Sequence, residues 1–224
     1  MIEQPSIFIY GLRIDEPVTT ITDLFISAVC FYAYFRLTKL AERQKLHQFL
    51  RFYFLSIGIA TFIGGIIGHG FIYLFSFPWK LPGWLTSMLS VALIERASIE
   101  HARKLISPRL ARTLAGLNIL ELLTFMTLTF TYLNFFFVEV HTTYGLLIVV
   151  ASLNIYIYYR IRSQGSKLFL IAVGFSAIGA LIFMNKWSIH MWFNYLDLSH
   201  VLLTISAIFF YKGSRIIILN TRQN

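Results

Sequence analysis

The sequence of 224 residues contains a single cysteine, Cys30, which lies inside an apolar stretch. One cysteine excludes an intrachain disulfide and any metal site that needs several thiolates. Charge is also scarce, because charged residues make up 13% of the chain, whereas a soluble domain carries about 25%. Negative charge is the scarcer of the two signs, with 10 Asp and Glu residues against 19 Lys and Arg residues. The chain therefore lacks the surface composition of a soluble protein.

What is present instead is apolar: hydrophobic residues make up 57% of the chain, and 22 residues are Phe. Seven stretches are long enough to cross a hydrocarbon core, which takes about 20 apolar residues as a helix. We place them at residues 17–38, 52–76, 84–104, 112–134, 138–159, 168–186 and 195–215. The sequence therefore predicts an all-α integral membrane protein, a bundle of seven transmembrane helices. The third stretch fits least well, since Glu95 and Arg96 interrupt it.

This pattern predicts three parts: a short extracytoplasmic segment at residues 1–16, one helical domain at 17–215 and a cytoplasmic tail at 216–224. The first residues, MIEQPSIFIYGLRIDEP, show no basic start followed by an apolar run. We therefore expect no cleavable signal peptide, and the first helix would act as its own insertion signal.

The basic residues predict an orientation. Sixteen of the nineteen Lys and Arg residues fall at one side of the predicted helices, which leaves Arg13, Lys80 and Lys186 for the other. The positive-inside rule then places the N-terminus outside and the C-terminus in the cytoplasm. We expect a plasma (inner) membrane rather than an internal one. Because the basic residues are spread over four short loops, we expect no nucleic acid as a partner.

Three of the predicted helices carry ionisable residues in the half of the membrane nearest the N-terminus. The first contributes Asp23, from a polar stripe that begins at Glu16, and the second places His69 among glycines. The seventh begins with polar residues at steps of three: Asn194, Asp197 and His200. Each ionisable side chain in lipid costs about 2.5 to 3.5 kcal/mol, so such residues normally face the bundle interior. We therefore expect one shared polar pocket.

Two interpretations of this pocket are open. The simpler one is a structural network, in which Asp23 orients His200 and Asn194 caps the seventh helix. The other is a zinc site, since a catalytic zinc takes about three protein ligands, commonly imidazoles and a carboxylate.

His69, Asp197 and His200 would supply the zinc ligands. Asp197 and His200 stand at i and i+3, and residues at that spacing share a helix face and can ligate together. Asp23 would then be the catalytic residue, either orienting an imidazole or acting as general base.

A histidine late in the second helix and one at the start of the seventh resemble the CREST superfamily of membrane hydrolases. That group includes the alkaline ceramidases and the progestin and adipoQ receptors, whose seven-helix bundles hold a zinc near the end where the N-terminus lies. His69 matches the zinc histidine of the second helix, and His200 matches the second histidine of the His-x-x-x-His pair of the seventh. The resemblance implies zinc-dependent hydrolysis of a lipid amide or ester.

The sequence also departs from that pattern. Leu196 stands at the position of the first histidine of the pair, so Asp197 or His190 would have to replace it. Gly65 stands where the superfamily has a serine, and the third helix offers hydroxyl residues where an aspartate is expected. Asp23 would then fill the missing acidic role, which implies a divergent relative with a rearranged site.

A second set of polar residues falls on the third and fourth helices, and includes Glu95, Asn118 and Glu121. We expect structural pairing among them or with a neighbouring arginine. His141 follows the fourth helix, where we place it in an outer loop and expect it to be solvated.

The leading functional hypothesis is a CREST-like zinc-dependent intramembrane hydrolase. Its partner would be a membrane lipid that enters between the helices, because an acyl chain needs an apolar channel. The alternative is a non-catalytic seven-helix receptor, transporter or complex subunit, whose Asp/His pocket binds a ligand or relays protons. A haem held by His69 and His200 ranks lowest, since Asp197 is a poor neighbour for an apolar macrocycle.

Overall fold

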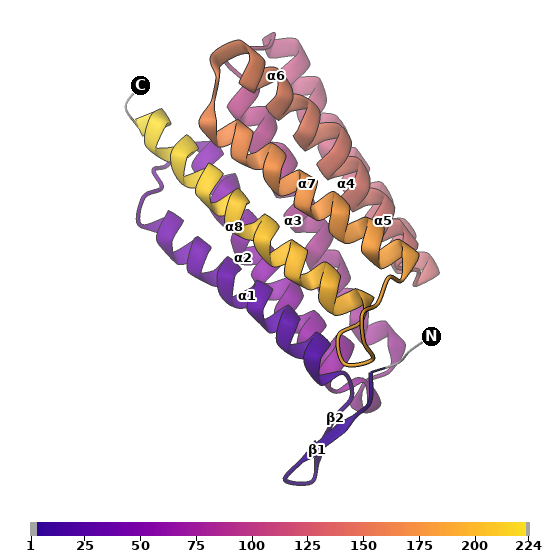
Figure 1. The fold of residues 1–224 in the computed structure, drawn as a ribbon. Coiled ribbons are helices and arrows are strands. Elements are labelled where there is room, and N and C mark those ends of the chain that lie inside the picture. The colour runs from indigo at the N-terminus through magenta and orange to yellow at the C-terminus, as the bar shows by residue number, and fades with distance from the viewer. Residues whose placement is uncertain (1–3, 223–224) are drawn as a thin grey trace.

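The computed structural model describes residues 4–222. A β-hairpin precedes a bundle of helices that run back and forth along one direction (Figure 1). The elements are β1 (Ile7–Ile9), β2 (Leu12–Ile14), α1 (Pro17–Thr38), α2 (Lys45–Ile63), η1 (Gly64–Gly70), η2 (Ile72–Leu74), η3 (Phe77–Lys80), α3 (Leu81–Ala102), α4 (Pro108–Tyr132), α5 (Phe136–Thr143), η4 (Tyr144–Val150), α6 (Ala151–Ile161), α7 (Gln164–Asn185) and α8 (Tyr195–Arg222).

Two of the segments are π-helical and lie within longer rods. Segment η1 continues α2, and η4 connects α5 to α6 without a break in the helical path. The described residues therefore form seven rods, as predicted: α1, α2 with η1, α3, α4, α5 through α6, α7 and α8.

Six of these rods are long and apolar enough to cross a membrane, which indicates a membrane protein. The third rod, α3, is not among the six found in residues 4–222. It includes Glu95, Arg96 and Glu100, and half of its residues are buried. Because α3 packs against both α2 and α4, Glu95 is buried by protein, whereas Arg96 and Glu100 are partly exposed.

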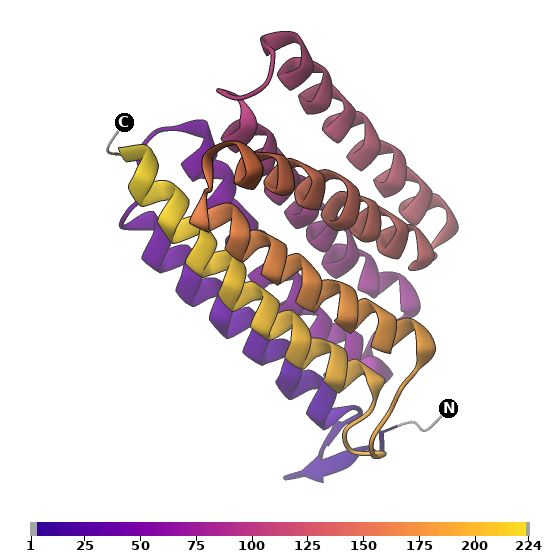
Figure 2. The same ribbon diagram turned by 45° about the horizontal axis from the view of Figure 1, so that its top comes forward.

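The core lies mainly between α1, α2, α7 and α8, since α1 packs against α2 and α8, and α8 packs against α7. Its largest buried side chains include Leu50, Phe54, Phe169 and Phe210. Cys30, fully buried on α1, belongs to the same core. In contrast, α4 runs along one side of the bundle (Figure 2) and exposes apolar side chains such as Leu120. In a bilayer those side chains would face lipid.

The observed bounds differ most from the predicted ones at two rods. The second helix begins earlier, at Lys45, and its helical run ends at Gly70. Helix α8 continues to Arg222, so residues 216–222, predicted as a tail, are helical. Ile217 and Ile218 are almost completely buried, and their packing explains why the helix extends so far.

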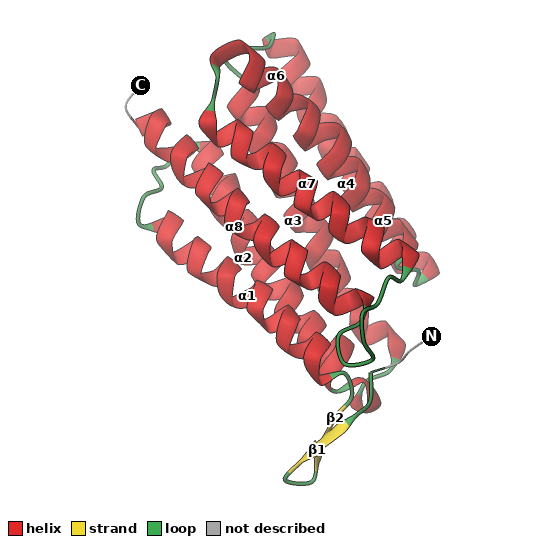
Figure 3. Ribbon diagram, viewed as in Figure 1, coloured by secondary structure: helices red, strands yellow, loops and turns green. Residues whose placement is uncertain are grey.

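The segment before α1 is a hairpin rather than an irregular chain (Figure 3). Tyr10 and Gly11 have φ angles of 51° and 82°, and positive φ at both central positions suits a two-residue hairpin turn of type I′. After β2, the backbone N–H of Asp15 donates to the carbonyl oxygen of Gly70 at 2.9 Å. This bond joins the hairpin to the end of η1, and the C-terminal end of α8 lies at the opposite end of the bundle (Figure 1).

Candidate functional site

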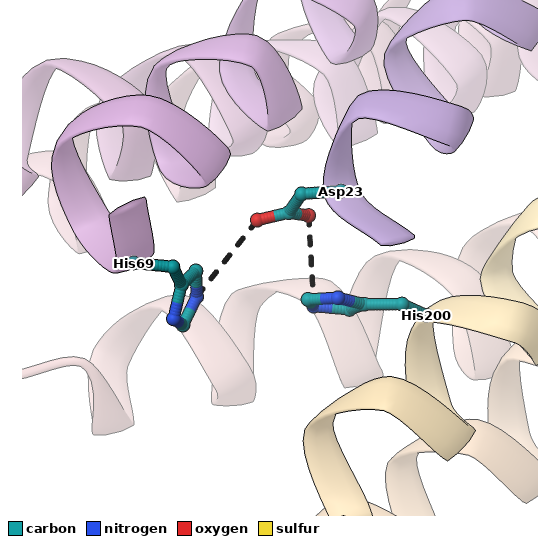
Figure 4. A group of neighbouring side chains, drawn as sticks. All are labelled: Asp23, His69 and His200. Atoms are coloured by element: carbon teal, nitrogen blue, oxygen red, sulfur yellow. Dashed lines mark ion pairs between the residues drawn. The ribbon is translucent and has the colours of Figure 1, made fainter. Parts of the chain in front are cut away.

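Side chains from three rods converge near the hairpin end of the bundle. Asp23 on α1, His69 on η1 and His200 on α8 each offer a ligand atom, and these atoms lie within 4.8 Å of one another. The Asp23 carboxylate faces both imidazole rings (Figure 4). Its Oδ2 lies 3.8 Å from Nε2 of His69, and its Oδ1 lies 3.5 Å from Nε2 of His200. The structure thus brings together residues that the sequence places at matching depth on three helices.

Glycine lets η1 approach α1 closely at this point. A Cβ on Gly64 would lie 3.2 Å from Oδ2 of Asp23, and a Cβ on Gly65 would lie 3.1 Å from Cβ of Asp23. Separations of that kind are tighter than side chains normally allow, so a larger residue would force the two helices apart. The π-helical form of η1 adds to the irregularity, and π-bulges occur often at functional sites.

The other ring nitrogens of the two histidines contact polar groups of α1 and its N-terminus. Nδ1 of His69 lies 2.5 Å from Oε2 of Glu16, and Nδ1 of His200 lies 3.0 Å from Oγ1 of Thr22. The Thr22 hydroxyl already donates to the carbonyl oxygen of Thr19 at 3.0 Å, so it accepts from His200. The carboxylate of Glu16 likewise lies where it can accept from Nδ1 of His69. An imidazole with its single proton on Nδ1 carries its lone pair on Nε2.

Two Nε2 lone pairs and a carboxylate then face one another inside the protein. Their separations of 3.5 and 3.8 Å exceed the 2.7 to 3.2 Å of ordinary N–H···O hydrogen bonds. Three electron-rich atoms at such distances repel one another unless a positive charge lies among them. The group formed by Asp23, His69 and His200 therefore has the character of a cation site.

Asp197, the carboxylate that the sequence favours as a ligand, is directed elsewhere. Its Oδ2 accepts from the backbone N–H of Asn194 at 2.7 Å, and its Oδ1 accepts from the hydroxyl of Thr19 at 2.9 Å. The side chain of Asn194 in turn accepts from the backbone N–H of Leu196 at 2.8 Å. This reciprocal arrangement is a capping box at the start of α8. Asp23, rather than Asp197, completes the group with the two histidines.

The predicted network interpretation is thus correct in one respect, because Asn194 caps the seventh helix. His190, the other substitute considered for a ligand, lies exposed in the connection before α8 and accepts from the backbone N–H of Trp192. A haem between His69 and His200 is disfavoured, since the Asp23 carboxylate lies within 3.8 Å of both Nε2 atoms.

The group lies at the wall of a large cavity. The cavity has a volume of about 700 Å³, within the range of about 300 to 1,000 Å³ that small-molecule sites occupy. Glu16, Asp23, His69 and His200 line it, whereas Asp197 does not. The remaining lining is mostly apolar and comes from α2, α3, α5, η4, α7 and α8, with Ile57, Val91, Val138, Leu146, Phe183 and Leu203 among its side chains.

A second group of ionisable side chains lies on other helices, where Glu95, Glu121 and His141 offer atoms within 4.8 Å of one another. The amide of Asn118 donates to Oε2 of Glu95 at 3.0 Å, as the predicted structural pairing requires. The prediction that His141 is solvated is wrong, since it is fully buried in α5 and contacts Glu121 at 2.6 Å. This pair joins residues of α4 and α5 through tertiary packing, which no local sequence pattern indicates.

The fold and the site define a class: a seven-helix protein with six apolar helices and an Asp/His group at the wall of a large cavity. The chain belongs to a family of unknown function, DUF6962, which matches residues 18–218. The matched range contains Asp23, His69 and His200. No curated protein and no solved structure matches the chain. The resemblance to the CREST superfamily therefore rests on the matched histidines alone.

Proposed function

We propose that this protein is a zinc-dependent intramembrane hydrolase that cleaves an amide or ester bond of a lipid. The observation that carries the proposal is the convergence of His69, His200 and Asp23 at the wall of a cavity large enough for a ligand. The resemblance to the CREST superfamily points to the same chemistry through His69 and His200.

The donor atoms fit zinc in type and in spacing. Two imidazole nitrogens and one carboxylate oxygen form a ligand set found in catalytic zinc sites, which keep a fourth position open. Ligand atoms at 2.0 to 2.2 Å from one tetrahedral ion lie roughly 3.3 to 3.5 Å apart. Oδ1 of Asp23 lies 3.5 Å from Nε2 of His200, at the upper end of that range, while its other oxygen, Oδ2, lies 3.8 Å from Nε2 of His69. Glu16 adds the carboxylate–histidine contact that commonly supports zinc ligands.

In this proposal, His69, His200 and Asp23 hold the metal, and Glu16 and Thr22 fix the orientation and protonation of the two rings. When bound, zinc would polarise the substrate carbonyl and make a water molecule acidic enough to attack at neutral pH. Asp23 would ligate through one oxygen and accept the water's proton on the other, which retains its predicted role as general base. The C–N or C–O bond then breaks, the proton passes to the leaving amine or alcohol, and a carboxylic acid is the second product.

The shape of the cavity supports a lipid as the substrate. Its lining is mainly apolar away from the Asp23 group, which suits an acyl chain, while the reacting bond would lie beside the two histidines. The exposed rings of Phe77 and Phe135 contribute to the lining at the hairpin end of the bundle. Since most basic residues lie toward the opposite end, we propose that the hairpin end faces outward across a plasma membrane.

A non-catalytic receptor, transporter or complex subunit is the second candidate. One observation favours it: the bundle holds two separate groups of buried and partly buried ionisable side chains, and such groups within membranes often mark ion pathways. Catalytic turnover distinguishes the two candidates.

The first experiment measures metal in protein purified in detergent without a chelator. We expect one zinc per chain in the wild type and loss of most of that zinc in His69→Ala and in His200→Ala. His190→Ala is the matched control, because that exposed histidine lies outside the group, and it should keep its zinc. Wild-type protein that contains no metal and does not take up zinc after dialysis would overturn the proposal.

The second experiment measures turnover in vesicles that contain a lipid amide or a lipid ester. The wild type should release fatty acid from one of the two, and a chelator should abolish the release. Asp23→Asn should lose activity in parallel with its metal. Stoichiometric zinc without hydrolysis of either lipid would favour the non-catalytic candidate.

A further inference from the structure

The second ionisable group, which we call the Glu95 cluster, consists of Glu95 on α3, Glu121 on α4 and His141 on α5. Glu95 is 1% exposed and His141 is fully buried. The proposed hydrolase chemistry uses none of these residues. A buried group with two carboxylates and one imidazole needs an account of where its charges are compensated.

His141 contacts an acceptor at each ring nitrogen. Its Nδ1 lies 2.6 Å from Oε1 of Glu121, and its Nε2 lies 2.9 Å from the carbonyl oxygen of Met88. A carbonyl oxygen accepts only, so Nε2 is protonated, and the short contact to Glu121 requires a second proton between Nδ1 and the carboxylate. The pair is therefore a hydrogen-bonded imidazolium and carboxylate. A separation of 2.6 Å is too short for two ligands of one metal ion, which lie roughly 3.3 to 3.5 Å apart.

Glu95, unlike Glu121, has no cationic side chain paired with it among residues 4–222. Its Oε2 accepts from the amide of Asn118, and its Oε1 is buried without a hydrogen-bond partner among the described residues. The neighbouring Arg96 points away, since its guanidinium donates to the carbonyl oxygen of Ala115. The ionisable groups that face Glu95 are Glu121 and His141, whose charges already cancel. An ionised Glu95 would thus be a buried anion with no counterion.

The space around Oε1 of Glu95 favours a proton over a metal ion. A Cβ on Gly145 would overlap Oε1 and would lie 2.5 Å from Cγ1 of Val91, so the main chain of η4 covers that oxygen. Oε2 of Glu121 is likewise buried without a hydrogen-bond partner in residues 4–222, and it offers an acceptor within the cluster. Val91, whose side chain lies beside Gly145, also lines the large cavity.

We propose that Glu95 is a proton-binding site inside the bundle. The carboxyl group takes up one proton and becomes a neutral acid beside the Glu121 and His141 ion pair. Release of the proton leaves a buried carboxylate, which destabilises the packing of α3 against η4 and favours uptake again. Proton binding at Glu95 does not depend on zinc at Asp23, and the two proposals can fail separately.

Infrared spectroscopy of the full-length protein in detergent tests this site. We expect the wild type at neutral pH to show a carboxylic-acid C=O band that disappears in Glu95→Gln, a variant with the shape of the protonated acid. Glu139→Gln is the matched control and should keep the band, since Glu139 lies outside the cluster. Asn118→Leu removes the donor to Oε2 and should shift the frequency of the same band. That shift provides a test even if Glu95→Gln folds poorly.

Thermal unfolding at several pH values gives an independent result. An unfolded glutamate ionises above a pKa of about 4.3, so a folded state that keeps the proton loses stability as pH rises from about 5 to 8. The wild type should therefore lose more Tm over this range than Glu95→Gln. A band that persists in Glu95→Gln, or equal pH slopes in both proteins, would overturn the proposal. So would a Tm that depends on added Na⁺ or Ca²⁺ in the wild type alone, which would indicate a metal cation at Glu95.

Discussion

Replacing Asp197 by alanine should destabilise the protein and leave its metal in place. The carboxylate of Asp197 is fully buried and accepts from the backbone N–H of Asn194 and from the hydroxyl of Thr19. The amide of Gln4 adds a longer contact at 3.3 Å. These contacts hold the start of α8 against α1 and the N-terminal segment, and none of them involves His69 or His200.

The magnitude follows from the contacts that are lost. Removal of a capping side chain costs about 1 kcal/mol, and a buried donor left without an acceptor costs about 1 to 3 kcal/mol. Because the Thr19 hydroxyl can rotate toward another acceptor, we expect a total of about 2 to 4 kcal/mol for Asp197→Ala. In a chain of this size 1 kcal/mol shifts Tm by about 2 to 4 °C, so Tm should fall by roughly 4 to 16 °C. Asp197→Asn keeps one acceptor oxygen and should fall less.

The assay compares two carboxylate variants, each with its Tm and its zinc content measured on the same preparation. Asp197→Ala should lose Tm and keep zinc, whereas Asp23→Asn should lose zinc, because an amide is a poor ligand and its NH₂ group can donate to a histidine Nε2. The reverse outcome, with zinc absent from Asp197→Ala and retained in Asp23→Asn, would refute the assignment of these two carboxylates.

Three further predictions concern the orientation of His200, the packing of η4 and the direction of the helices. Thr22→Val removes the acceptor for Nδ1 of His200 and should weaken zinc binding about 10- to 100-fold in a chelator competition; unchanged affinity would show that the hydroxyl does not orient the ring. Gly145→Ala places a Cβ against α3, so unfolding should become easier by about 1 to 3 kcal/mol, and a Tm equal to the wild type would contradict the packing of η4. A reporter active only in the cytoplasm should be silent when fused after Lys80 and active after Ser163; the opposite pattern would invert the proposed orientation.

The number of helices and the depth of their polar residues could be predicted from sequence, because both depend on spacing along one chain. Twenty apolar residues specify a helix long enough to span a membrane, and helical periodicity places Asp23 and Glu16 on one face. Opposite directions of successive helices then bring His69 and His200 to the same end. The predicted convergence required no knowledge of side-chain contacts.

Asp197 contacts the start of α8 rather than the two histidines, and spacing alone could not separate these roles because one spacing serves two purposes. Residues at i and i+3 can ligate a metal together, but an acidic residue three positions after an Asn at a helix start is also the signal of a capping box. Asn194 stands directly before the first residue of α8, and that position favours the cap. The capping rule, applied to Asn194 and Asp197, would have left Asp23 as the available carboxylate.

The length and direction of hydrogen bonds, which no sequence pattern specifies, separate the two ionisable groups. Both contain histidine and carboxylate, yet His141 uses both nitrogens as donors, while His69 and His200 each leave Nε2 facing Asp23. Zinc added to chelator-treated protein with ¹⁵N-labelled histidine should therefore shift the ring signals of His69 and His200 and leave those of His141 unchanged. A shift at His141 with none at His69 would place the metal in the Glu95 cluster and would reverse the roles proposed for the two groups.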